Sequence, residues 1–194
     1  CCFRFTANQN VIISDVAEAD KAAINTILER FKVTAFTEKT SLVRKNAIAC
    51  VALPTCPLAL AEGQRYMPVL LGKIEPLLQQ HGLAEQDIIM RMTGCPNGCA
   101  RPYAAEIAFI GTAPGRYNLQ LGGDNQGGRL NKTYKENLDE PAILAELDSL
   151  ADAPRLPKVH SPSETSTKTP SEPAPAPQTA PPAAPRAGVA PLFL

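Results

Sequence analysis

The sequence predicts an α+β domain with a ferredoxin-like mixed sheet, covering helices and cluster-binding loops, followed by a disordered proline-rich tail. Three observations support this: short apolar runs bounded by turn residues, amphipathic stretches at helical spacing, and an abrupt change of composition near residue 151. We expect the domain over residues 1–151 and the tail over 152–194. With 194 residues, of which 44% are hydrophobic, the chain is long enough for one domain core.

The first half predicts strand followed by helix. The segment "FRFTANQNVIISDV" contains a short apolar run at 11–13, which is typical of a strand. In "EADKAAINTILERFKV", Ala23, Ile27 and Phe31 recur at helical spacing, which predicts an amphipathic helix. After a polar connection, a second helix is expected over 58–80, interrupted near Pro68 and ended by Gly82.

The second half predicts further strands and a last helix. "DIIMRM" and "AAEIAFIGT" are each typical of a strand, and "GRYNLQLGGDNQGGRLNK" predicts a strand, a glycine-rich turn and a further strand. "EPAILAELDSL" predicts the last helix, with Pro141 at an allowed early position. We expect the first strand and helix to join these later elements in one sheet.

The tail differs from the domain in composition. Residues 154–194 hold 11 of the 19 prolines, and such a segment buries too little apolar area to offset the entropy of ordering. Its polyproline stretch could dock an SH3-like domain or serve only as a linker.

Charge and targeting signals narrow the classes of function. The 19 basic and 19 acidic side chains balance, which gives no electrostatic case for nucleic acid or for an anionic membrane. The sequence contains no run of about 18 apolar residues and no signal peptide at its start, so we expect a cytoplasmic protein. The missing initiator Met predicts a piece of a longer chain.

Six cysteines carry the strongest chemical signal. Cys50 and Cys56 form a C-x5-C pair, Cys95 and Cys99 form a C-x3-C pair, and a doublet stands at the start of the chain. In a reducing compartment, clustered cysteines are more often metal ligands or redox groups than structural disulfides. The C-x5-C gap is a poor match to zinc knuckles, whereas an iron-sulfur cluster tolerates varied spacing.

Prolines and glycines frame both pairs. Pro54, Pro57 and Pro96 stiffen the loops, while Gly94 and Gly98 allow close approach of the backbone and leave N–H groups for sulfur atoms. A metal or cluster site is favoured, with a redox disulfide pair and plain packing of buried thiols left open as alternatives.

The segments "ACVALPTCPLALAEGQRYMP" and "RMTGCPNGCARPYAAEIAFIGTAPGRYNLQLGG" resemble the C-terminal part of the hemoproteins in the sulfite/nitrite reductase family. The resemblance runs from about residue 3 to 150, and "APGRYNLQLGG" resembles the NADPH-dependent branch. It implies a [4Fe-4S] cluster and siroheme as cofactors. It also implies that Cys50, Cys56, Cys95 and Cys99 are the cluster ligands and that Cys99 is the catalytic axial thiolate shared with the siroheme iron.

The resemblance further implies six-electron reduction of sulfite to sulfide, with electrons from an NADPH-dependent flavoprotein reductase subunit. Nitrite reduction is the alternative within the family. A non-catalytic metal-binding or interaction module, with zinc at the same thiols, is the alternative outside it. Because relatives are about three times longer and their sulfite-binding cations lie mostly in the other half, we expect this chain alone to be inactive.

Other candidate residues carry two interpretations each. Asn97 is either a hydrogen-bond donor beside the cofactor or a residue favoured by the turn. The polar residues of the loop 6–10 either lie near siroheme, as the resemblance implies, or have only a capping or turn role. Five cations are either partners of siroheme carboxylates or solvated surface groups: Arg91, Arg101, Arg116, Arg129 and Lys132. His81 is expected to interact with a helix C-terminus, and His160 lies in the tail.

Overall fold

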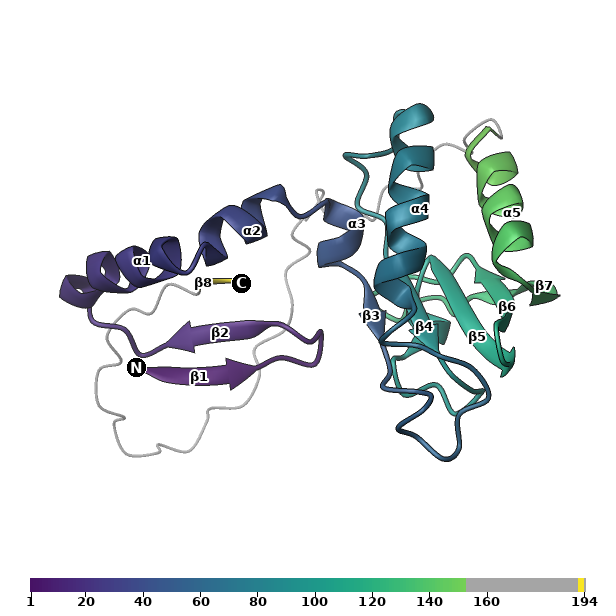
Figure 1. The fold of residues 1–194 in the computed structure, drawn as a ribbon, viewed down its shortest axis with the longest axis horizontal. Coiled ribbons are helices and arrows are strands. Elements are labelled where there is room, and N and C mark those ends of the chain that lie inside the picture. Colours follow the sequence, from purple (N-terminus) through teal and green to yellow (C-terminus); the bar gives the residue numbers. More distant parts are fainter. Residues whose placement is uncertain (153–191, 194) are drawn as a thin grey trace, which may run out of the picture.

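The computed structural model describes residues 1–152 and 192–193. Figure 1 shows two lobes, one built around a hairpin with a long helix and the other around the main sheet. The strands are β1 (Cys2–Phe5), β2 (Val11–Ser14), β3 (Ile48–Ala49), β4 (Met90–Thr93), β5 (Ile107–Ala113), β6 (Arg116–Leu121), β7 (Lys132–Leu138) and β8 (Leu192–Phe193). The helices are η1 (Glu18–Asp20), α1 (Lys21–Arg30), α2 (Val33–Lys39), α3 (Leu42–Lys45), α4 (Met67–Gln80), η2 (Pro102–Ala104) and α5 (Glu140–Asp152).

The main sheet has five strands in the order β3-β4-β5-β6-β7. β4 pairs in parallel with β3 on one side and with β5 on the other. The pairs β5–β6 and β6–β7 are antiparallel and form a meander. The predicted α+β class with a mixed sheet and covering helices is confirmed. Most of the predicted tail lies outside the described residues, but its residues Leu192–Phe193 form β8, which pairs with β2.

One face of the sheet carries the hydrophobic core. α4 packs on this face through five buried side chains: Met67, Leu70, Leu71, Ile74 and Leu78. The same core cluster contains side chains of three strands and of α5: Met90, Met92, Phe109, Leu119 and Ile143. Both α4 and α5 lie on this face (Figure 1). Because side chains alternate along a strand, the residues between the core positions point to the opposite face, away from α4 and α5.

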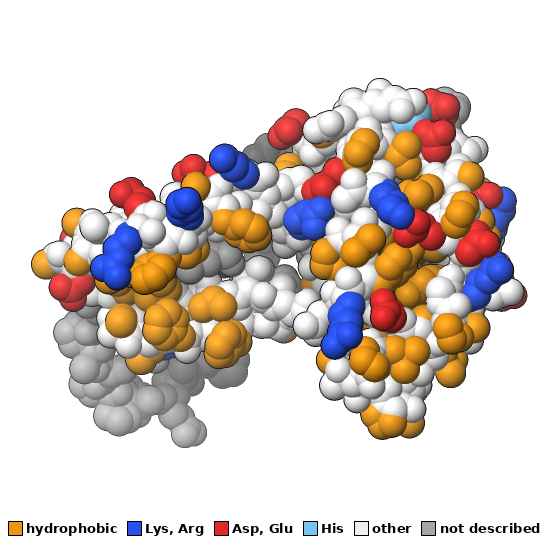
Figure 2. Space-filling model, viewed as in Figure 1, with side chains coloured by type: hydrophobic (Ala, Val, Ile, Leu, Met, Phe, Trp, Pro, Cys, Tyr) orange, Lys and Arg blue, Asp and Glu red, His pale blue; other side chains and the backbone are white. Residues whose placement is uncertain are grey.

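The N-terminal elements form a separate lobe. β1 and β2 make a hairpin that pairs with β8, so the first strand does not join the main sheet, and that expectation is wrong. Five large apolar side chains of this lobe are more than half exposed: Phe3, Phe5, Ile27, Phe31 and Phe36. Figure 2 shows hydrophobic side chains gathered on this lobe. The predicted helix is present as α1, but only Leu28 is buried, so most of its apolar stripe has no cover within the described chain.

Two expected segments differ in the structure. The polar connection contains the short helices α2 and α3, and the predicted helix over 58–80 begins only at Met67. Residues before Met67 cannot continue the helix because their backbone groups bond elsewhere: the N–H groups of Leu60 and Ala61 donate to the Gly94 carbonyl. Gly82 follows the helix end with φ +65°, as predicted for a C-cap.

In the described part of the chain, no helix is both long enough and apolar enough to cross a membrane.

Candidate functional site

The two cysteine motifs begin where two neighbouring parallel strands end. Cys50 directly follows β3, and Cys95 comes two residues after β4. Parallel neighbours place their carboxyl ends at one edge of the sheet, so motifs far apart in the sequence lie together. The Cys50 N–H donates to the Met92 carbonyl at 3.1 Å, which extends the β3–β4 pairing up to the first thiol.

All four motif thiols line one cavity of about 250 Å³, together with Asn97. Cys95 is buried, Cys50 and Cys56 are half-buried, and Cys99 is exposed. All four are free thiols. They surround a space without converging on one point: within the described residues, no three His, Cys, Asp or Glu side chains are gathered to hold a single metal ion.

Short backbone contacts hold the motif loops against each other. The Gly94 N–H donates to the Cys50 sulfur at 3.2 Å, so its partner in this structure is a thiol of the first motif. A Cβ on Gly94 would lie 2.6 Å from Ala52 Cβ and 2.6 Å from the Ala61 carbonyl oxygen. Only glycine therefore allows the second motif loop to approach the first this closely.

The hairpin tip closes one side of the cavity. Ala7 and Gln9 line it, and the Gln9 side chain bonds both backbone groups of Ala49, donating to the carbonyl at 2.8 Å. Thr6 and Asn10 close the turn itself, with the Asn10 N–H donating to Thr6 Oγ1 at 3.0 Å. The loop 6–10 thus forms a turn, as one of its two interpretations expected, and it also forms a wall of the thiol-lined cavity.

Backbone strain gathers at this cavity. Six non-glycine residues in the described chain have positive φ, and Gln9, Ala52 and Arg101 are three of them. Non-glycine residues avoid this region unless surrounding contacts hold them there, and such residues cluster at functional sites. The positive φ angles of these three residues could not be predicted from the sequence, because glutamine, alanine and arginine do not favour that conformation.

The predicted cations divide into separate groups. Arg101 lines the cavity, where its Nη2 donates to Asn8 Oδ1 at 2.6 Å. Arg116 pairs with Asp139 at 3.3 Å, away from the cavity, and neither Arg129 nor Lys132 lines it. Arg91 is 1% exposed, so its interpretation as a solvated surface group is wrong.

The histidine and the terminal cysteines lie outside the cavity lining. His81 caps α4 through its backbone N–H, but its ring contacts α5, at 2.8 Å from Asp148 and 3.0 Å from Asp152. The expected interaction of His81 with the helix C-terminus is therefore made by its backbone N–H, and its ring makes a separate contact with α5. Cys1 and Cys2 are exposed on the N-terminal strand. His160 lies outside the described residues.

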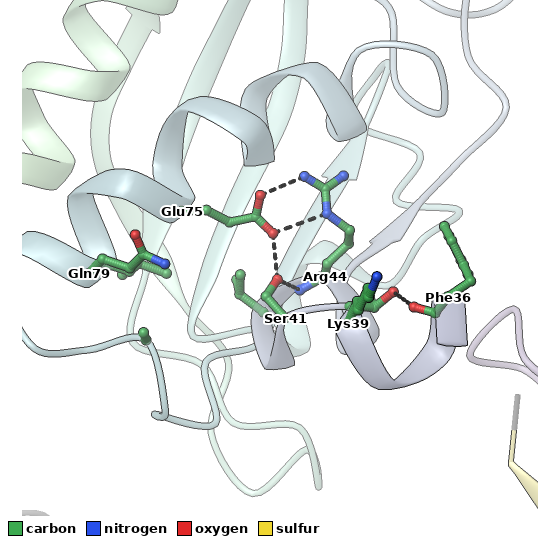
Figure 3. Close-up of a pocket in the computed structure, with 10 residues that line it drawn as sticks. Phe36, Lys39, Ser41, Arg44, Glu75 and Gln79 are labelled. Atoms are coloured by element: carbon green, nitrogen blue, oxygen red, sulfur yellow. Dashed lines mark hydrogen bonds and ion pairs between the residues drawn. The ribbon is translucent and has the colours of Figure 1, made fainter. Parts of the chain in front are cut away.

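A second cavity, of about 500 Å³, lies between α2, α3 and α4 (Figure 3). Two of its three charged lining residues, Arg44 and Glu75, satisfy each other, and Lys39 is the third. The Arg44 fork binds Glu75 with distances of 3.1 and 2.8 Å, and Ser41 donates to the same carboxylate. These contacts lower the pKa of Glu75 and raise that of Arg44. A mutually neutralised pair leaves little charge for a ligand, so the thiol-lined cavity is the better functional candidate.

Comparison with curated proteins finds close relatives, although no family model matches the chain. The chain is 62% identical over 148 residues to the sulfite reductase [NADPH] hemoprotein beta-component of Leptospira biflexa, covering 76% of this chain and 27% of that protein. Proteins of the same name from Afipia carboxidovorans and Myxococcus xanthus are 57% and 53% identical to the chain over 148 residues. These matches cover 25% and 26% of the two relatives and 76% of this chain.

A solved structure shares the fold. The Mycobacterium tuberculosis NirA protein superposes with a TM-score of 0.58 at 23% identity, covering 75% of this chain and 28% of that one. The chain thus spans about a quarter of the length of the curated relatives that it matches.

Proposed function

Because this chain is homologous to about a quarter of the hemoprotein beta-component of NADPH-dependent sulfite reductase, we propose that it is the cluster-binding C-terminal part of such an enzyme. In this proposal Cys50, Cys56, Cys95 and Cys99 hold a [4Fe-4S] cluster. Cys99 also serves as the axial thiolate of siroheme, and the whole enzyme reduces sulfite to sulfide in an assimilatory, cytoplasmic reaction.

One observation carries the proposal: four free thiols from two distant motifs line a single cavity. Four cysteine thiolates are the usual donor set of a [4Fe-4S] cluster. A single zinc ion, held about 2.3 Å from each of four sulfurs, leaves no space of this size between them. The cavity of about 250 Å³ therefore supports a bulky guest over the zinc-binding module.

The surroundings of the thiols also fit a cluster. The Gly94 N–H already points at the Cys50 sulfur, and amide donors to sulfur tune the redox potentials of such clusters. Val51, Leu58 and Ala59 give the lining an apolar part, which limits access of water. Arg101, the one cation among the described lining residues, adds a positive charge at the rim.

The exposure of Cys99 supports its double role. A thiolate that ligates a cluster and also contacts a macrocyclic iron must be accessible from outside the cluster cavity, and among the four motif cysteines only Cys99 is exposed. Siroheme and the cluster would together supply single-electron steps to bound sulfite. This chain's own contribution is to ligate through sulfur, to fix the thiols through the β3 and β4 ends, and to close one wall with the hairpin tip.

The partners of the whole enzyme are part of the same proposal. The relatives' name implies an NADPH-dependent flavoprotein component as electron donor, and sulfite is the substrate, with nitrite as the alternative. We expect no sulfite reduction by this chain alone, because Arg101 is a single cation where an anionic substrate and an acidic macrocycle need several.

Anaerobic purification followed by reconstitution with iron and sulfide tests the proposal. We expect about four iron and four sulfide per chain and a broad visible absorption band, both lost in the Cys95→Ser variant. The matched control is Cys2→Ser, which changes an exposed thiol outside the cavity and should load fully. Zinc without sulfide would refute the cluster.

Siroheme and activity are tested separately. Cys99→Ser should abolish electronic coupling between added siroheme and any cluster that still forms, seen as loss of the perturbed siroheme band. Robust sulfite reduction by the isolated chain with reduced methyl viologen would refute the expected inactivity.

A further inference from the structure

Arg91 is a buried cation in the middle of β4. It is 1% exposed, and its neighbours Met90 and Met92 belong to the core beneath α4. Since side chains alternate along a strand, the Arg91 side chain points to the opposite face of the sheet, away from α4 and α5. An arginine in such a position is uncommon because a buried charge is costly unless it is paired.

The guanidinium of Arg91 joins two loops. Its Nη1 donates to the Arg101 carbonyl at 2.9 Å, two residues after Cys99, and its Nη2 donates to Asn125 Oδ1 in the loop 122–131. That loop also supports the segment after Cys99 through Asn131, whose side chain donates to the Pro102 carbonyl at 2.7 Å. Arg91 thus ties the end of the second cysteine motif to the sheet.

The positive charge of Arg91 is not neutralised by a neighbour. None of the carboxylates in the described part of the chain lies within ion-pair distance of it, and its Nε is buried without a hydrogen-bond partner. Burial and the nearby positive charge of Arg101 lower its pKa, but an arginine stays protonated at neutral pH. The charge is therefore held in a low-dielectric region, where it acts strongly on its surroundings.

The position of Arg91 relates it to both motifs. Arg91 is four residues before Cys95. In the pairing of β3 with β4 it stands opposite Ile48, and Ile48 is two residues before Cys50. On the basis of the proposed function, we propose that Arg91 is a positioning residue of the cluster site. It fixes the loop that carries Cys99, and its uncompensated charge stabilises the reduced form of the bound cluster.

The electrostatic part follows from charge balance. Reduction adds one electron, supplied by a chemical or protein donor, to a cluster whose thiolates are already negative, and net charge is one of the factors that set cluster potentials. A fixed cation nearby lowers the energy of the more negative form. Loss of this charge should shift the reduction potential to a more negative value.

The test compares reconstituted chains carrying Arg91→Gln, Arg91→Lys or Asn125→Ala, with Arg116→Gln as the matched surface control. In a dithionite titration followed by electron paramagnetic resonance, the cluster of Arg91→Gln should be reduced at a more negative potential than that of wild type. Arg91→Lys keeps the charge but loses the two-pronged guanidinium, and Asn125→Ala keeps the charge but loses one of the two hydrogen bonds of Arg91. Both should lose iron to a chelator about 10-fold faster than wild type, with a nearly unchanged potential. Arg116→Gln should match wild type in both measurements.

The outcomes separate this inference from the proposed function. A wild-type chain that takes up no iron and sulfide overturns both. A loaded wild type with Arg91→Gln at the same potential and the same rate of iron loss overturns the role of Arg91 only. If Arg91→Gln does not fold, equal iron loss by wild type, Arg91→Lys and Asn125→Ala overturns the role, and faster loss by both variants supports it.

Discussion

The close approach of the two motif loops at Gly94 makes a quantitative prediction for Gly94→Ala. The new methyl group would lie 2.6 Å from Ala52 Cβ, 2.6 Å from the Ala61 carbonyl oxygen and 3.0 Å from Ala59 Cβ. None of these neighbours is the end of a flexible side chain, so none can rotate away. The Ala61 carbonyl is also held in place, because it accepts a hydrogen bond from the Leu53 N–H at 3.2 Å.

The cost of Gly94→Ala is that of overpacking. Extra methyl groups in well-packed regions cost about 1–3 kcal/mol, and three inflexible contacts place this site at about 2 kcal/mol. That free energy corresponds to about 30-fold in the ratio of folded to unfolded chains. For a domain of this size it lowers the melting temperature by about 4–8 °C. The displaced Gly94 N–H should also weaken cluster retention through Cys50.

Urea unfolding of the cofactor-free chain, followed by circular dichroism, measures this cost. Gly72→Ala is the matched control, because Gly72 is exposed on α4 and the nearest atom to its added Cβ is Arg44 Nη2, at 3.9 Å. The control should stabilise the chain by up to about 1 kcal/mol through helix propensity. A Gly94→Ala variant with the wild-type midpoint and slope would refute the assignment of Gly94 as a close-contact residue.

Three further predictions concern stability. Glu75→Gln should cost about 1 kcal/mol at pH 7 and progressively less as the pH is lowered below 4.5, measured by urea unfolding over a series of pH values. The reason is that Arg44 holds the pKa of Glu75 below its usual 4.5, so the pair stabilises the fold above that value and the effect is lost as pH falls through the lowered pKa. Tyr117→Phe removes the hydrogen bond from a buried hydroxyl to the Glu62 carbonyl, 2.9 Å long, and should cost about 1 kcal/mol with an unchanged urea slope. Leu70→Ala leaves a cavity at a fully buried core position and should cost about 2–5 kcal/mol; a cost under 1 kcal/mol would contradict the packing of α4 on the sheet.

Local sequence signals predicted the elements whose form depends on their own residues. The end of α4 follows from Gly82, which can adopt the left-handed conformation, and the early part of α5 accommodates Pro141 because a first-turn N–H has no helical partner. The start of α4 was missed because the residues before Met67 are apolar enough for a helix but bond to the second motif loop instead. Such competition between local and tertiary bonds leaves no mark in the sequence.

The sequence allowed prediction of the four cysteines that line the cavity, but not of the other residues that surround them. The cysteine spacing and the resemblance named the four thiols, and the parallel pairing of β3 with β4 brings them together. β3 has only two residues, too few for a recognisable strand pattern. The burial of Arg91 could not be predicted, because arginine is usually exposed and the residues that its guanidinium contacts, such as Asn125, are distant in the sequence.

The crossover from β3 through α4 to β4 has a consequence for biosynthesis. The 45 positions from Cys50 to Cys95 take a ribosome on the order of several seconds to translate, and β3 has no sheet neighbour in the main sheet until β4 emerges. During that interval the first two thiols have neither their partners nor the cavity wall that shields them from oxidants and stray metal ions. If the proposed function is correct, all four thiols can bind iron and sulfide together only after the second motif has left the ribosome.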